Sequence, residues 1–429
     1  MRKGVLTAPT VNGNDSVISG LSNPKAIILW TTKQTAAGAA DKHGEFYLGA
    51  ATFDGGAVQQ WYISFADEDA LGTSNTARGN NTTACLKGYS AFTTPTVEFE
   101  ARLVSMDATS VTIDWFDAPA TAILVHYLVV EGTDATSARC GNFTTSTAVA
   151  TQNVTVNAGF GQPDLHFFAT NSSTTQGEAA SSTRLNLGWA NKAGERRQSG
   201  IWANDAATTM NLSAVQTEHA FATLASVTAF EAQANLSAAA SWPTDGFQIA
   251  YADQASVLHF VYYLAIKGVQ SKIGVNTAPI TGTPPVVQDN AAGFAPTGGI
   301  FMGWHKGAAT TIDSTGADVI GWFFGATDGT NEGLSAYTQD DANTTSFSGN
   351  VHSETKSLAN YTSPGVAGAP TLQSEADGSF SGNNVRASWN DIDTVAREYI
   401  WVALGAAAGG VRPLFELRPL LMTLSRNRG

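Results

Sequence analysis

Short apolar runs separated by polar turns recur along the whole chain. In residues 111–115, apolar side chains alternate with polar ones, which places one face of a strand on a core and the other toward water. Runs such as Ile27-Ile-Leu-Trp30 are rich in the β-branched and aromatic residues that are typical of strands. Asp245-Gly246 and Asp377-Gly378 are turn signals between such runs. The pattern predicts a protein built of short strands.

Helical periodicity is nearly absent. The best helical candidate is the stretch 217–233, which is rich in Ala, Leu and Glu, but it merges into a strand-like segment. We therefore expect little helix and an all-β fold.

Three apolar segments that each begin with proline indicate an internal repeat. They are Pro24-Lys-Ala-Ile-Ile-Leu-Trp30, Pro163-Asp-Leu-His-Phe-Phe168 and Pro296-Thr-Gly-Gly-Ile-Phe-Met-Gly-Trp304. A glycine follows each proline after 25 residues, at Gly49, Gly188 and Gly321. Equal spacings between equivalent landmarks are the signature of a repeated structural unit.

Pairs of aromatic residues give a second set of landmarks. Each pair is 12 residues apart, and the pairs are Trp115 with Tyr127, Tyr251 with Tyr263, and Trp389 with Trp401. An aspartate follows the first aromatic by two residues every time, at Asp117, Asp253 and Asp391. We therefore expect three diverged copies of one module.

The repeat sets the predicted domain organisation. We place β-sandwich modules at 1–138, 139–270 and 271–405, and a C-terminal arm at 406–429. About eight short strands per module suit a jelly-roll-like sandwich. Its two sheets would bury the repeated aromatics, with a carbohydrate-stacking platform as the alternative function for them. These candidate core aromatics are Trp30, Trp115, Tyr127, Tyr251, Tyr263, Trp304, Trp389 and Trp401.

Composition and charge narrow the possible partners. The 429-residue chain has 43% hydrophobic residues, enough for packed cores, but only 14% charged residues. The formal net charge of −13 argues against nucleic-acid binding, which needs clustered Lys and Arg. No apolar run approaches the length of a membrane span, and we expect neither a membrane partner nor a signal peptide. Cys85 and Cys140 could form one disulfide or remain buried free thiols.

Catalytic chemistry is not repeated. None of the seven histidines recurs at an equivalent position in all three modules, and no zinc-protease, P-loop, dinucleotide or nucleophile-elbow motif occurs. We expect no enzyme activity, no metal and no cofactor. A lone carboxylate is a poor cation site, so Asp117, Asp253 and Asp391 are predicted to close turns by accepting a backbone N–H, with a metal or acid role as the alternative.

The C-terminal arm departs from the repeat. A linker Ala406-Ala-Ala-Gly-Gly410 leads to an apolar stretch with more Arg than acidic residues and two prolines. We predict that this arm docks on a partner or a neighbouring subunit, or else folds back on the third module. The candidate partner contacts are Leu414, Phe415, Leu417, Leu420 and Leu421.

Three of these motifs resemble a group of phage and prophage proteins. The resemblance rests on Pro24-Lys-Ala-Ile-Ile-Leu-Trp30, Asp245-Gly-Phe-Gln-Ile249 and Tyr262-Tyr-Leu-Ala-Ile-Lys-Gly268, and it extends over about 400 residues. The third module departs most, because Ser379 replaces the turn phenylalanine. The resemblance implies a virion structural protein that contacts other virion proteins as a homo-oligomer or multi-copy assembly.

Three functions compete at this point. The first is a non-enzymatic virion protein of a tail, fibre or adhesion apparatus. The second is a capsid decoration protein whose three modules match a threefold position. The third is an array of carbohydrate-binding modules, or a glycan-active enzyme, that contacts a cell-surface glycan.

Overall fold

The computed structural model describes residues 1–38, 40–41, 43–54, 56–68, 73–205, 212–226, 228–304, 320–339, 348–362 and 370–407. The fold is all-β, as predicted, and its sheets are antiparallel and paired as sandwiches. The one helical element in the described part is a 3₁₀ turn, η1 (Ala239–Ser241). The stretch 217–233, the best helical candidate in the sequence, belongs to strands instead.

In the described residues, ten strands of the first module form its two sheets. The larger sheet has the order β1-β11-β3-β5-β6-β7, and the smaller has the order β2-β10-β9-β8. The strands are β1 (Arg2–Thr7), β2 (Asn14–Ser19), β3 (Pro24–Thr31), β5 (Gly44–Asp54), β6 (Ala57–Asp67), β7 (Thr76–Asn81), β8 (Leu86–Ala91), β9 (Thr96–Met106), β10 (Ser110–Asp117) and β11 (Leu124–Glu131).

The second module repeats this topology strand by strand. Its larger sheet has the order β12-β22-β14-β16-β17-β18, and its smaller sheet β13-β21-β20-β19. The strands are β12 (Ser137–Thr144), β13 (Thr151–Thr155), β14 (Leu165–Thr170), β16 (Thr183–Asn191), β17 (Arg196–Ala203), β18 (Leu212–Thr217), β19 (Phe221–Ser226), β20 (Ala229–Leu236), β21 (Gly246–Asp253) and β22 (Phe260–Lys267).

The third module repeats it again, as β23-β32-β25-β26-β27-β28 and β24-β31-β30-β29. The strands are β23 (Val269–Thr277), β24 (Val286–Ala291), β25 (Gly298–Trp304), β26 (Ile320–Thr327), β27 (Glu332–Gln339), β28 (Ser348–Ser353), β29 (Leu358–Thr362), β30 (Thr371–Ser381), β31 (Asn384–Asp391) and β32 (Glu398–Ala406). The divisions drawn from the sequence at 138/139 and 270/271 fall just inside β12 and β23.

Strand register corrects one landmark of the repeat. The partners of Leu29, Phe168 and Phe301 on the neighbouring strand are Gly49, Gly188 and Gly325. The third glycine is therefore Gly325 and not Gly321, because the connection between β25 and β26 is four residues longer than its counterparts. A Cβ at each of these glycines would overlap a backbone carbonyl of the opposite sheet, at Cys85, Ala220 and Ser357 respectively.

The larger and smaller sheets bury their residues differently. Every residue of β14 is buried, whereas β10 alternates between buried and partly buried positions. The smaller sheets therefore face water on one side, while each larger sheet is covered on both faces. Continuous apolar runs in the sequence correspond to the larger sheets for this reason.

A common core joins the three modules, which corrects the expectation of separate sandwiches. Each sandwich has its own cluster of buried side chains, but a further cluster contains residues from all three larger sheets. In it, Trp61 of the first module contacts Phe167 of the second, with ring centroids 6.0 Å apart. Phe324 of the third lies 6.1 Å from Phe167 and 5.2 Å from Trp30.

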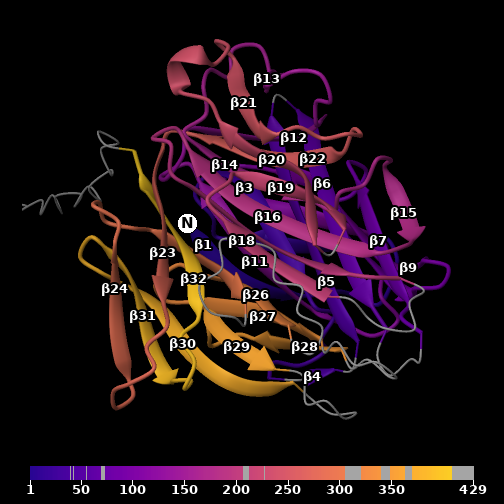
Figure 1. Ribbon diagram of the computed structural model, residues 1–429, viewed down its shortest axis with the longest axis vertical. Helices are drawn as coiled ribbons and strands as arrows, with labels where there is room; N and C mark the ends of the chain where they lie inside the picture. The colour runs from indigo at the N-terminus through magenta and orange to yellow at the C-terminus, as the bar shows by residue number, and fades with distance from the viewer. Residues whose placement is uncertain are drawn as a thin grey trace, which may run out of the picture.

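The modules form a closed ring around this core. The first strand of each module packs on the fourth or fifth strand of the module before it: β12 on β5 and β6, β23 on β16 and β17, and β1 on β27. Figure 1 shows the outer strands β13 and β21 at the top, β24 and β31 at the lower left, and β7 and β9 at the right, around the labelled N-terminus.

Two short strands reinforce the ring at its outside. β15 (Gly177–Ala180) of the second module pairs with β7 of the first, and β4 (Ala40–Asp41) of the first module pairs with β28 of the third. Both lie in the connection between the third and fourth strands of their own module. In both cases the short strand pairs with the preceding module in the ring. That is also the module on which the first strand packs.

Candidate functional site

Polar side chains lie at the seams between modules, and one hydrogen bond recurs at all three seams. A backbone N–H of the first strand donates to a side-chain oxygen at the hairpin between the fourth and fifth strands of the preceding module. The three bonds are Cys140 N to Thr52 Oγ1, Ile273 N to Glu195 Oε2, and Lys3 N to Asp328 Oδ2, each 3.0 Å long. Thr52 and Asp328 each lie three residues after the repeated glycine of the fourth strand, whereas Glu195 lies seven residues after it, on the other arm of its hairpin. The hydrogen bond therefore recurs at all three seams although its acceptor differs in type and position.

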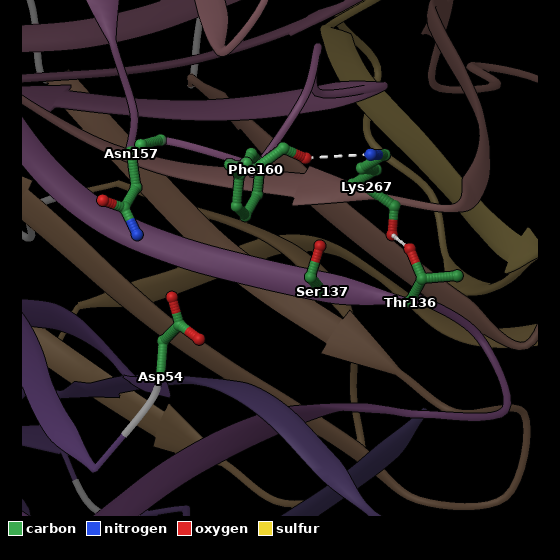
Figure 2. Close-up of a pocket in the computed structure, with 8 residues that line it drawn as sticks. Asp54, Thr136, Ser137, Asn157, Phe160 and Lys267 are labelled. Carbon is green, nitrogen blue, oxygen red and sulfur yellow. Dashed lines mark hydrogen bonds between the residues drawn. The ribbon is translucent and has the colours of Figure 1, made fainter.

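The seam between the first and second modules encloses a polar pocket of about 300 Å³ (Figure 2). Its lining includes Asp54 from one module and Ser137, Asn157 and Lys267 from the other. Asp54 pairs with Arg139 at 2.5 Å, and Lys267 Nζ donates to the carbonyl of Phe160 at 2.9 Å. The pocket can hold a small polar molecule, but it contains no nucleophile paired with a base.

The seam that closes the ring, between the third module and the first, buries a lysine. Lys3 is 1% exposed, and its Nζ lies 2.9 Å from His126 Nδ1 and donates to the carbonyl of Glu332 at 2.7 Å. His126 Nε2 lies 3.1 Å from the carbonyl of Leu334, which fixes a neutral tautomer with its proton on Nε2. The ring of His352 stacks on His126 with centroids 3.9 Å apart.

Burial governs the ionisation of this cluster. It lowers the pKa of Lys3 to about 7, against opposing attraction from Glu354, Asp328 and Glu332. It also lowers the pKa of His126 well below the usual value and that of His352 to about 3. Both imidazoles are fully buried, so the cluster packs the seam and gives no substrate access to a base.

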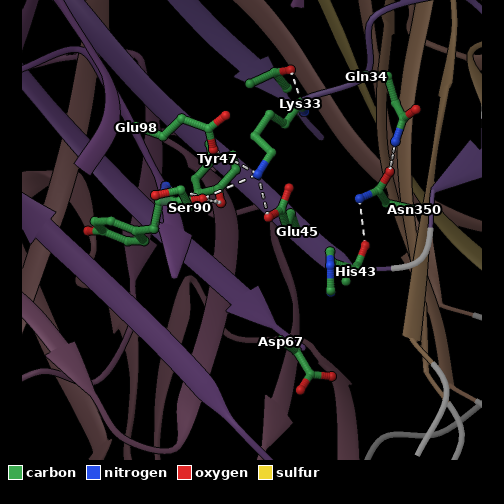
Figure 3. A network of polar contacts seen from close by, with 12 residues as sticks. Lys33, Gln34, His43, Glu45, Tyr47, Asp67, Ser90, Glu98 and Asn350 are labelled. Carbon is green, nitrogen blue, oxygen red and sulfur yellow. Dashed lines mark hydrogen bonds and ion pairs between the residues drawn. The ribbon is translucent and has the colours of Figure 1, made fainter. Parts of the chain in front are cut away.

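A second polar network links the first module to the third beside the same seam (Figure 3). Lys33 Nζ lies 2.9 Å from both Glu45 Oε1 and Glu98 Oε2, and these carboxylates outweigh burial and raise the pKa of Lys33. Gln34 donates from its amide to Asn350 of the third module, whose own amide donates to the carbonyl of His43 at 2.6 Å.

Backbone strain accompanies this network at a repeated position. Lys33 has φ 61°, and the equivalent Ser172 in the second module has φ 52°. In both, the strained residue's N–H donates to the threonine two residues earlier, Thr31 or Thr170. Both side chains then bond to the smaller sheet, at Tyr89 O and Leu224 N. The repetition gives the strain a structural role in joining the two sheets.

Glu332 is the residue that most resembles a catalytic acid. It borders a pocket of about 390 Å³ with Glu354, Lys356 and Asp377, and burial raises its pKa to about 7. A carboxyl group kept neutral beside ionised ones can act as a general acid. Its Oε2, however, already accepts hydrogen bonds from Gly378 N at 2.7 Å and Ser357 Oγ at 2.8 Å.

The repeat explains the hydrogen bond from Gly378 N to Glu332. Gln60 occupies the equivalent position in the first module, and its Oε1 accepts from Leu103 N at 2.9 Å. Leu103 and Gly378 are themselves equivalent positions of the eighth strand. Glu332 therefore joins the two sheets in the third module as Gln60 does in the first.

The repeated aromatics lie in two different cores. Trp115, Tyr263, Trp389 and Trp401 are buried within their sandwiches, and Tyr127 and Tyr251 pack against them partly buried. Trp30 and Trp304 lie instead in the common core, on the other face of the larger sheet. The reason is alternation along β3: Leu29 faces the sandwich, so Trp30 must face the neighbouring modules.

The repeated aspartates follow a repeated β-bulge. In β10, β21 and β31, the register shifts between the aromatic residue and the aspartate two positions later. Asp253 and Asp391 are exposed and Asp117 is half-buried. Asp117 accepts a long hydrogen bond from the Asn12 amide at 3.5 Å. Among the hydrogen bonds of the described residues, the predicted acceptance of a backbone N–H does not occur at any of the three.

Several sequence-based candidates carry no site. Cys85 and Cys140 are free and buried, and burial raises the pKa of both thiols. The predicted partner contacts Leu414, Phe415, Leu417, Leu420 and Leu421 lie outside the described residues. Within the described part of the chain, no group of three or more His, Cys, Asp or Glu could hold a metal ion. Nor does any helix in that part have the length and apolar character needed to cross a membrane.

Comparison with known proteins adds no relative. No family model, no curated protein and no solved structure matches this chain.

Proposed function

We propose that this chain is a non-enzymatic structural protein of a phage particle, and that it acts as a single-chain counterpart of a homotrimer. The observation that supports this most is the closed ring of three like modules around one core. Threefold closure is a property of assembly components, and fusing three copies in one chain lets each module diverge while the symmetry is kept.

The distribution of polar groups supports a structural role over a catalytic one. The buried Lys3, His126 and His352 lie in a seam, and Glu332 is held as a link between sheets. The pocket lined by Asp54 and the pocket bordered by Glu332 lie at different places in the repeat, whereas a triplicated enzyme would repeat its site.

We place the protein in a tail, fibre or adhesion apparatus, as the motif resemblance implies. A capsid decoration protein at a threefold position is the second candidate, and the threefold ring is the observation that favours it. The protein would be part of the virion and would contact other virion proteins.

An array of carbohydrate-binding modules has less support. Phe116 is 54% exposed and stacks under the Arg102 guanidinium at 3.7 Å, which is a plausible sugar platform. The equivalent residues, one after each repeated aromatic, are Ala252 and Asn390. The platform is therefore confined to one module and does not share the symmetry of the ring.

The proposal is tested on phage particles produced by cells that carry this gene. Particles purified on a density gradient are expected to contain the chain at a fixed copy number by quantitative mass spectrometry, and electron microscopy should place it at a threefold position. A variant lacking residues 406–429 should fold yet be absent from particles. Particles of full infectivity that lack the chain altogether would refute a structural role.

A further inference from the structure

Each module has one tip, formed by two connections that lie side by side. The first connection joins the module's first and second strands, and the second joins its ninth and tenth strands. One backbone hydrogen bond of 2.8 Å joins the two connections in every module: Ala8 N to Ile123 O, Thr145 N to His259 O, and Ala278 N to Arg397 O. The three tips are therefore equivalent by the symmetry of the ring.

The tips gather exposed apolar side chains. Half of the large hydrophobic residues that are exposed in the described part of the chain lie in these connections. They are Val11 in the first module, Val149, Val257 and Leu258 in the second, and Ile280 and Val395 in the third, exposed by 46–59%. Scattered single apolar residues need no explanation, but their recurrence at one place in each module does.

The repeated aspartates lie at the same tips. Asp117, Asp253 and Asp391 end the ninth strand, directly before its connection to the tenth. The residue between aromatic and aspartate has diverged to Phe116, Ala252 and Asn390, whereas the acid is kept in all three modules. Contacts within the described part of the chain do not account for this, since there the Asp117 carboxylate alone among the three accepts a hydrogen bond, and that bond is long.

We infer that the three tips are docking points for a threefold partner that presents, at each contact, a lysine or arginine beside an apolar depression. A carboxylate that is exposed or half-buried, in the same tip as an exposed apolar side chain, is complementary to that surface in charge and in hydrophobicity. The three equivalent positions fit a partner with three such surfaces around one axis. The inference deepens the proposed function, because a partner of that symmetry exists at a threefold position of a particle.

The energetics predict weak contacts that add up. A solvent-exposed charge pair changes affinity only about two- to five-fold. Three contacts on one rigid ring act together, so their simultaneous loss should lower affinity by roughly 10- to 100-fold. Binding should also weaken steeply between low and high salt, because exposed charges are screened.

The test uses particles stripped of the protein and rebinding of the purified full chain. The variant Asp117→Asn/Asp253→Asn/Asp391→Asn is expected to rebind at least ten-fold more weakly than wild type. The matched control Asp15→Asn/Glu218→Gln/Glu354→Gln removes the same charge from exposed positions, one per module, outside the tips. It should rebind within two-fold of wild type, and thermal melting should show that both variants are folded.

Each outcome decides one point. If wild type rebinds and the tip variant rebinds equally well, the inference fails while the proposed function stands. If wild type itself does not rebind, the proposed function fails and the inference with it. If light scattering shows that copies of the chain bind one another and that only the tip variant abolishes this, the occupant is a second copy and the threefold partner is refuted.

Discussion

At the scale of single residues, the internal repeat places different side chains at equivalent positions, so their effects can be compared. Glu332 and Gln60 make the same link between sheets, but only Glu332 can ionise. Its pKa is raised to about 7 from a usual 4.5, so folding favours the protonated form. The stability that this proton contributes is fully present below pH 4.5 and is lost as the pH rises through 7.

Glu332→Gln should therefore stabilise the protein at pH 8, by about 1 to 3 kcal/mol, and change little at pH 4.5. Urea unfolding at the two pH values measures the difference, and Asp15→Asn is the control because Asp15 is exposed and borders neither the Glu332 pocket nor Lys3. An equal effect of Glu332→Gln at both pH values would show that the carboxyl group is not held protonated.

Gly188 tests the close approach of the two sheets. A Cβ there would overlap the backbone carbonyl of Ala220, which cannot move without shifting the smaller sheet. Gly188→Ala is expected to lower the free energy of unfolding by about 3 kcal/mol or more, measured by denaturant titration. In Gly299→Ala, the nearest atoms are the methyl carbons of Thr327 and Val385, each 3.2 Å away, and no backbone carbonyl is overlapped, so the loss should be about 1 kcal/mol. Similar losses for both would mean that the sheets are loosely packed.

At the scale of strands, the sequence predicts much of what is local to one module. Alternation in residues 111–115 predicts β10, and the 12-residue aromatic spacing predicts β10 and β11, which lie in opposite sheets, because both patterns depend on which face of a strand is buried. The error at Gly321 arose because a longer connection shifts a spacing without changing the strands. The helical candidate 217–233 shows that Ala and Leu also enter strands of the smaller sheet, where β20 alternates between buried and partly exposed positions.

The seams could not be predicted, because they depend on side chains that differ in type between modules. Thr52, Glu195 and Asp328 accept the same hydrogen bond, but they differ in chemical class, and Glu195 also differs in position, so a sequence comparison would not align them. A signal did exist in the first strands. Gly4, Gly141 and Gly274 each make room for the aromatic ring at Tyr127, Tyr263 or Trp401 of the neighbouring strand.

Thr52 tests the seam hydrogen bond. Thr52→Val keeps the shape of the side chain but leaves the buried N–H of Cys140 without its acceptor, and it also removes the hydroxyl's bond to Gln59. Stability should fall by about 1 to 3 kcal/mol in denaturant titration. Thr52→Ser retains the hydroxyl, so its stability should fall by less. If Thr52→Ser is destabilised more than Thr52→Val, packing of the methyl group and not the hydrogen bond holds this seam.

At the scale of the whole molecule, the common core was beyond the sequence for a physical reason. The sequence around Trp30 and Trp304 has the same apolar pattern in either of two cases: the second face of their sheet packs on another layer of the same module, or it packs on another module. Only the long-range contacts decide between these. Burying such a side chain contributes about 1.5–3 kcal/mol wherever it is buried, so hydrophobicity alone cannot distinguish the two.

The ring makes a prediction about chain connectivity. Its seam between the third and first modules has no covalent link, yet it has the same strand packing and backbone hydrogen bond as the other two. Met1 lies against Gly298, with Cγ 2.9 Å from where a Cβ would be, and Gly298 is the register partner of Leu404. The start of the chain is thus close to the end of β32.

A circular permutant should therefore fold to the same ring. It would begin at Thr133, join residue 407 to Met1 by a short Gly-Ser linker, and end at Gly132, so that the covalent link moves from one seam to another. We expect a single cooperative unfolding transition, because surface connections between elements tolerate such breaks. The free energy of unfolding should be about 3 to 5 kcal/mol below that of the parent 1–407 chain, because the linker removes the buried ion pair between the Met1 ammonium and Asp134. A permutant opened between Phe167 and Phe168, inside the fully buried β14, should fail to fold. Separate melting of one module in the first permutant would mean that covalent order, and not the common core, holds the three modules together.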